Sequence, residues 1–156
     1  MGAVEYDTIA AIKQTVEIPV IANGDIDSSE SAQQVLSQTK ADAIMIGRAA
    51  QGRPWLFAQI AKYLSTGHLL DSPTQTERAS ILLAHLKDIH AFYGERLGVK
   101  FARKHIKWYA AHWDGSINPN AMSLALRTEN AQQQLVHLFD ALPDLNHGAA
   151  RHFLAA

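Results

Sequence analysis

Two short, continuously apolar runs constrain the fold of this chain more than any other feature of its sequence. They cover residues 18–22 and 41–46, and each ends in a turn that contains glycine. Helical periodicity surrounds them over residues 6–16, 28–39 and 54–67, which gives the order α-β-α-β-α. Short apolar runs between helices are typical of parallel strands whose sheet is covered on both faces.

Two parallel strands are too few to form a stable sheet with closed edges. The first half of the chain is therefore predicted to be part of a larger α/β sheet. We expect its open edges to pair with further strands or to cause self-association of the chain.

The second half of the chain predicts helices only. Residues 74–77 form a candidate capping box before a helix that ends near Gly94, and a second helix covers residues 100–113. Asn118 is expected to cap a third helix and Thr128 a fourth. With the linker placed at residues 65–73, the predicted fold class is α/β over residues 1–70, followed by an all-α segment over 71–156.

Composition excludes several classes of protein. The 156 residues carry 14 Lys and Arg against 15 Asp and Glu, so a uniformly charged nucleic-acid binder is excluded. Cysteine is absent, which removes disulfides and thiolate metal sites, and the spacing of the histidines predicts no metal site. The sequence contains no apolar run of ~18 residues and no signal-like start, so we expect a cytoplasmic protein without a membrane partner.

Polar residues and glycines follow both predicted strands directly. Asn23, Gly24 and Asp25 come after the first, and Gly47 and Arg48 come after the second. Loops at the carboxyl ends of parallel strands converge on ligands, and in an eight-stranded barrel the last two such loops often bind phosphate. Glycine exposes main-chain N–H groups to an anion, and a guanidinium matches phosphate oxygens. The alternative is that each glycine only closes a turn between strand and helix.

Positive charge is concentrated on the helix predicted over residues 100–113. At ~100° per residue, four cations fall within about 100° of arc. They are Lys100, Arg103, Lys104 and Lys107. Aromatic and histidine side chains border this arc: Phe101, His105, Trp108 and His112. The opposite face is expected to be the core and holds Ala102, Ile106, Tyr109 and Trp113. Cations beside a stacking surface suit an RNA backbone and an unpaired base, whereas the alternative is an ordinary solvated helix face.

Residues 18–26 (IPVIANGDI) and 45–57 (MIGRAAQGRPWLF), together with Arg103-Lys104-His105, resemble the tRNA-dihydrouridine synthase family, in particular its bacterial B-type. The resemblance implies the C-terminal part of a (β/α)8 TIM barrel, here two parallel strands with flanking helices. An all-α helical bundle that binds tRNA follows. It also implies reduction of uridine to dihydrouridine in tRNA by FMN, which is recharged by NADPH.

The resemblance also assigns roles to the residues described above. The implied FMN-binding residues are Asn23, Gly24, Asp25, Gly47 and Arg48. The implied tRNA-binding residues are Lys100, Arg103, Lys104, His105, Lys107 and Trp108. The family's proton-donating cysteine has no counterpart here, so we predict no catalytic residue in the chain and no activity of the chain alone. Two other readings stay open: a non-catalytic RNA-binding or interaction module, and part of a phosphate-binding barrel enzyme acting on small metabolites.

Overall fold

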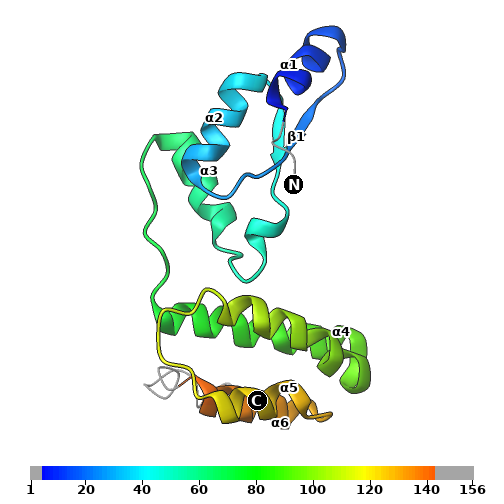
Figure 1. Cartoon of the computed structure of the whole chain (residues 1–156), viewed down its shortest axis with the longest axis vertical. Helices are drawn as coiled ribbons and strands as arrows, with labels where there is room; N and C mark the ends of the chain where they lie inside the picture. Colours follow the sequence, from blue (N-terminus) through cyan, green and yellow to red (C-terminus); the bar gives the residue numbers. More distant parts are fainter. Residues whose placement is uncertain (1–4, 143–156) are drawn as a thin grey trace. The chain divides into compact units, whose positions relative to one another are not determined.

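The computed structural model describes residues 5–142 and divides into two compact units between Ser72 and Pro73. We call them the α/β unit and the helical unit, and each is described by itself (Figure 1). Within residues 5–142, no helix combines the length and the apolar character needed to cross a bilayer.

The α/β unit has the predicted order of helices and strands. Its elements are α1 (Tyr6–Thr15), β1 (Ile21–Asn23), α2 (Ser29–Thr39), β2 (Ala43–Met45), the 3₁₀ turn η1 (Arg48–Ala50) and α3 (Leu56–Thr66). The two strands are parallel, with Ile21 opposite Ala43 and Asn23 opposite Met45. The mixed α/β class with two parallel strands is therefore confirmed.

In the described chain, only one face of this two-stranded sheet is covered. One face packs on α2 and α3, where Ala22 is fully buried in a cluster with Val35 and Leu56. On the opposite face, Ile21 and Met45 are 62% and 52% exposed. Each strand has only three residues and is shorter than its apolar run.

Capping and loop contacts explain where the elements of this unit begin. The Ser28 hydroxyl accepts from the main chain of Ser31, and Ser31 reaches back to Ser28, so a capping box starts α2. Asp42 accepts from Lys13 at 2.6 Å and from the main-chain nitrogen of Val20 at 2.7 Å, which ties the segment before β2 to α1 and β1. Pro54 lies in a turn before α3 and not in its first turn.

The helical unit begins with a helical hairpin. The helix α4 (Gln75–Ala110) is interrupted at Gly94, where φ is 72° and ψ is 168°. Its two halves lie along each other, since the ring of His85 lies 4.8 Å from that of His105, and a Cβ on Gly98 would lie 2.8 Å from the Cα of His90. The two helices predicted on either side of Gly94 are confirmed, although the second ends at Ala110 and not at residue 113.

Two shorter helices, α5 (Pro119–Arg127) and α6 (Ala131–Ala141), pack on each other and against α4. Asn118 caps α5 as predicted, and the predicted capping box of Thr74 and Glu77 starts α4. The prediction that Thr128 caps the last helix is wrong. Asn130 caps α6 by accepting from the main chain of Gln133, while Thr128 ends α5.

The interior of the helical unit is apolar apart from one amide. Seven of its large side chains are at most 1% exposed: Leu82, Leu83, Leu86, Val99, Ile106, Leu138 and Leu142. The buried amide of Gln134 on α6 donates to the main-chain oxygens of Val99 and Ala125 at 3.2 and 3.0 Å. Its oxygen lies 2.8 Å from His90 Nε2, so one side chain joins both halves of α4 to α5 and α6. Buried amides need such partners because an unpaired one costs ~1–3 kcal/mol.

Candidate functional site: strand-end turns and a basic helix face

The two turns that follow β1 and β2 lie next to each other. Because Asn23 pairs with Met45 in a parallel register, both strands end at the same edge of the sheet. Arg48 Nη2 then donates to Asp25 Oδ1 at 2.9 Å, which joins the first turn to the second across 23 residues of sequence. Both side chains are largely exposed, at 66% and 58%. The structure therefore brings together the residues predicted at the two strand ends.

The first turn has an unusual backbone that a half-buried tyrosine supports. Gly24 has a φ of 145° and Asp25 a φ of 42°, so both lie in the region that side chains disfavour. The hydroxyl of Tyr6 on α1 donates to the main-chain oxygen of Gly24 at 2.7 Å. Burial raises the pKa of Tyr6, and the carboxylates of Asp25 and Asp27 raise it further. A protonated Tyr6 therefore holds this turn in place.

The second turn leaves room beside its backbone. Gly47 separates β2 from η1, and a Cβ placed on it would meet nothing within 4 Å. Arg48 is the first residue of η1. A ligand can therefore approach the main chain at Gly47, next in sequence to the Arg48 that pairs with Asp25.

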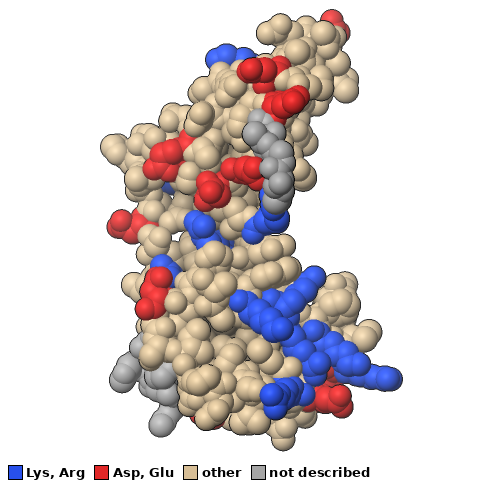
Figure 2. Space-filling model, viewed as in Figure 1, with Lys and Arg blue, Asp and Glu red and all other residues tan. Residues whose placement is uncertain are grey.

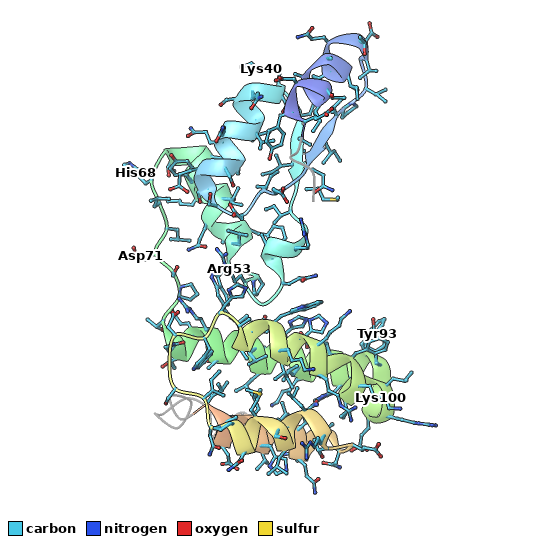
Figure 3. The ribbon with its side chains drawn as sticks, in the orientation of Figure 1. Lys40, Arg53, His68, Asp71, Tyr93 and Lys100 are labelled. Carbon is cyan, nitrogen blue, oxygen red and sulfur yellow. The ribbon has the colours of Figure 1, made fainter. Side chains whose placement is uncertain are left out.

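The helical unit carries the basic residues predicted on one helix face. Figure 2 shows Lys and Arg side chains gathered on this unit, and five of them fall within residues 96–107, which contain no acid. Lys100, Lys104 and Lys107 are exposed, whereas Ala102, Ile106 and Tyr109 on the opposite side of the helix are buried. Figure 3 shows Lys100 in the second half of α4, near the end of the hairpin at which Tyr93 lies.

Aromatic side chains border these lysines. Lys104 Nζ lies 5.1 Å from the centre of the Trp108 ring, within the range of a cation–π contact. The ring of His105 lies 4.9 Å from that of Trp108 and 4.8 Å from that of His85, both edge-on. Burial lowers the pKa of His105, and His85 and Lys104 lower it further. The structure thus groups three of the predicted RNA-binding residues: Lys104, His105 and Trp108.

Arg103 differs from the three lysines in its surroundings. Its Nη2 donates to the main-chain oxygens of Thr128 at 3.1 Å and of Arg127 at 3.4 Å. These carbonyls lie at the end of α5, where a positive charge is favourable. Arg103 is therefore half-buried against α5, whereas the lysines of the same face point to solvent.

Comparison with known proteins shows the family to which the chain belongs. A family model described as dihydrouridine synthase matches residues 1–142. The chain belongs to the dihydrouridine synthase family. It is 53% identical over 140 residues to tRNA-dihydrouridine synthase B of Pseudomonas aeruginosa, which covers 90% of the chain and 42% of that relative. Its identity to the protein of the same name from Xanthomonas campestris is 51% over 154 residues, or 96% of the chain and 46% of the relative. The chain thus spans less than half the length of these two relatives.

The family resemblance predicted from the sequence is confirmed, and the strand-end residues can be tested against the cofactor that it implies. The guanidinium of Arg48 and the open main chain at Gly47 suit the phosphate of FMN. The amide of Asn23 and the carboxylate of Asp25 suit hydroxyl groups of a ribityl chain. These residues therefore fit the phosphate and ribityl portion of FMN. The ion pair with Asp25 offsets part of the positive charge of Arg48.

Two residues of these sites were not predicted from the sequence. Tyr6 supports Gly24 from 18 residues away, and His85 contacts His105 from the other half of the hairpin. Both belong to periodic helical segments in which nothing distinguishes them from their neighbours. Their contacts become visible only when α1 is packed beside the first turn and the two halves of α4 beside each other.

Proposed function

We propose that this chain is part of a flavin-dependent tRNA-dihydrouridine synthase, which reduces particular uridines of tRNA to dihydrouridine. The ion pair of Asp25 and Arg48 is the structural observation that carries the proposal, because it joins the two turns expected at a phosphate site. The names of the similar proteins and the family match over residues 1–142 support the same reaction.

The two units would divide the work. The α/β unit would be part of a (β/α)8 barrel, and its strand-end turns would hold the phosphate and ribityl portion of FMN. When bound, FMN supplies the hydride for the uracil ring after NADPH has reduced it. The helical unit would bind tRNA through Lys100, Lys104 and Lys107, with His105 and Trp108 as a stacking surface.

Each residue of the strand-end site would have a definite task. Arg48 would donate two parallel hydrogen bonds to phosphate oxygens, and Gly47 would let the main chain approach the same group. Asp25 would orient Arg48 and accept from a ribityl hydroxyl. The 156 residues contain no cysteine to donate the proton that the uracil ring needs, so the chain alone would bind its ligands without turnover.

Titration of FMN into the chain tests the cofactor site. Arg48→Gln should weaken FMN binding by about tenfold or more, because a charge-assisted hydrogen bond contributes ~1.5–3 kcal/mol. Lys62→Gln is the matched control, since it removes an exposed cation of α3 outside the site. Quenching of flavin fluorescence measures both. Equal affinities for the two variants would refute the role of Arg48.

A turnover assay and a tRNA-binding assay separate the remaining alternatives. With tRNA, FMN and NADPH, the chain alone should form no dihydrouridine, and product formation would overturn the predicted inactivity. Binding of tRNA without any binding of FMN would support a non-catalytic RNA-binding module. Binding of FMN or small phosphates without tRNA would support an enzyme of small metabolites.

A further inference from the structure

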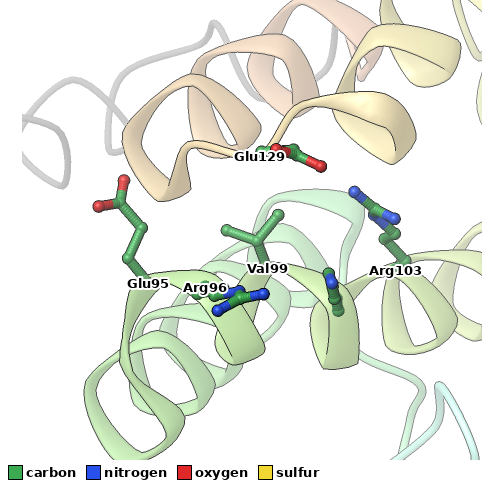
Figure 4. Close-up of a pocket in the computed structure, with 6 residues that line it drawn as sticks. Glu95, Arg96, Val99, Arg103 and Glu129 are labelled. Carbon is green, nitrogen blue, oxygen red and sulfur yellow. The ribbon is translucent and has the colours of Figure 1, made fainter.

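A pocket in the helical unit lies beside the basic helix face. It has a volume of about 360 Å³ and lies between the second half of α4 and the connection from α5 to α6. Figure 4 shows Glu95, Arg96, Val99 and Arg103 on the α4 side, with Glu129 opposite. Lys100 completes the lining. The volume is in the range of small-ligand sites and suits one nucleotide unit of a longer chain.

The charges of this pocket favour an anion. Three cations and two acids line it, but one of the acids is already engaged. Glu95 Oε1 accepts from Asn130 Nδ2 at 2.7 Å and from the main-chain nitrogen of Ala131 at 3.2 Å, so it stabilises the start of α6. These donors are neutral, so Glu95 keeps its negative charge. Both acids oppose an incoming anion, and the three cations outweigh them by one charge.

Arg103 is held in place and still has donors to offer. Both of its hydrogen bonds use Nη2, and its Nη1 and Nε have no acceptor among residues 5–142. Nε is also buried from solvent. Because Nε is buried, Nη1 is the donor left for an anion in the pocket, and the charge of that anion would offset part of the cost of the unpaired Nε. The contacts with Arg127 and Thr128 fix the guanidinium before any ligand arrives, which reduces the entropy lost on binding.

We infer that this pocket binds one phosphate group of an RNA backbone, with Arg96, Lys100 and Arg103 as its donors. The inference rests on the proposed tRNA-binding function and adds a specific subsite to it. Lys104 and Trp108 lie on the other side of the basic face, so one strand of RNA crossing that face would place a phosphate in the pocket and a base beside Trp108. The phosphate belongs to a polynucleotide in this arrangement, not to a free nucleotide.

Affinity for tRNA tests the pocket with two opposite charge changes. Arg96→Gln should weaken binding about three- to tenfold and lower the slope of log K against log salt by about one, because one phosphate contact is lost. Glu129→Gln should strengthen binding several-fold, since it removes one of the two acids that oppose the phosphate. Both side chains are exposed, so neither change affects packing. Lys62→Gln on α3 is again the control for net charge and should change neither quantity.

A second measurement observes Arg103 directly. In a ¹H–¹⁵N spectrum, the Nε–H resonance of Arg103 should shift on addition of tRNA and barely respond to uridine 5′-monophosphate or inorganic phosphate at the same phosphate concentration. If wild-type chain binds tRNA but the pocket variants match Lys62→Gln, the pocket assignment is wrong and the proposed function stands. If wild-type chain does not bind tRNA, the proposed RNA function fails and the assignment of the pocket to RNA fails with it. A strong shift with uridine 5′-monophosphate and none with tRNA would make the pocket a small-nucleotide site and overturn the inference.

Discussion

The α/β unit and the helical unit differ in how completely their apolar interior is covered. In the α/β unit, α2 and α3 cover one face of the two-stranded sheet, and the other face exposes Ile21 and Met45. In the helical unit, residues from α4, α5 and α6 bury one another, and Leu86 and Leu138 are fully inaccessible. Ile21 and Met45 lie on the same side of the sheet because side chains alternate along each strand.

This difference indicates which unit completes its own core. The helical unit encloses its interior side chains, such as Leu86 and Leu138, with its own helices, although Phe92 and Leu97 on its surface are exposed, so its stability depends on internal packing. The α/β unit leaves a sheet face of the kind that parallel sheets normally cover. Its uncovered face is what the proposed partial barrel predicts, because further strands would place side chains against Ile21 and Met45.

The largest effect should come from removing packing inside the helical unit. Leu86→Ala deletes most of a side chain that is 0% exposed and should lower the free energy of unfolding of this unit by ~2–5 kcal/mol. Urea unfolding, followed by Trp108 and Trp113 emission in a Trp55→Phe background, measures this unit without the α/β unit. Phe92→Ala is the control, since Phe92 is 81% exposed and its loss should cost no more than about 0.5 kcal/mol. Equal effects would show that the helical unit lacks the closed core described here.

Much of the helical unit could be predicted from periodicity and capping. The angular pattern around Lys100 predicts four inner-face residues, of which Ala102, Ile106 and Tyr109 are buried. The fourth, Trp113, is only half-buried because α4 ends before it, at Ala110. The spacing of Thr74 and Glu77 predicted the capping box that starts α4. Such local signals suffice because a helix forms its hydrogen bonds within one segment.

Contacts between segments could not be predicted in the same way. A helical wheel gives the direction in which Arg103 points, but it does not give the residues that Arg103 contacts. In the structure, these are two main-chain oxygens at the end of α5. Thr128 and Asn130 both have side chains that cap helices, and only the path of the chain after α5 selects Asn130. For the strand-end site, the sequence predicted that Asp25 and Arg48 lie close together, and their roles toward FMN stay predictions.

A smaller effect is expected when the open sheet face of the α/β unit is made polar. We predict that the chain self-associates through this face or its edges, and that Ile21→Thr combined with Met45→Gln weakens the association by about tenfold or more. The free energy of unfolding should change little, because both side chains are exposed. Sedimentation over a range of concentrations measures the association. Leu64→Gln changes an exposed residue of α3 and should leave it unaltered, and a wild-type chain that is monomeric throughout would contradict the prediction.

The smallest effect concerns the half-buried histidine of the helical unit. Burial, His85 and Lys104 lower the pKa of His105 below its unfolded value, so the folded state binds fewer protons than the unfolded state at mildly acidic pH. The stabilisation is complete above the unfolded pKa of about 6.5 and is lost as the pH falls through the lower folded pKa. His105→Gln should therefore reduce the loss of stability between about pH 7.5 and about pH 5.5, measured by urea unfolding at each pH. Parallel pH profiles for wild type and His105→Gln would mean that His105 is as well solvated in the folded helical unit as in the unfolded chain. The packed interior of this unit would then not extend to His105.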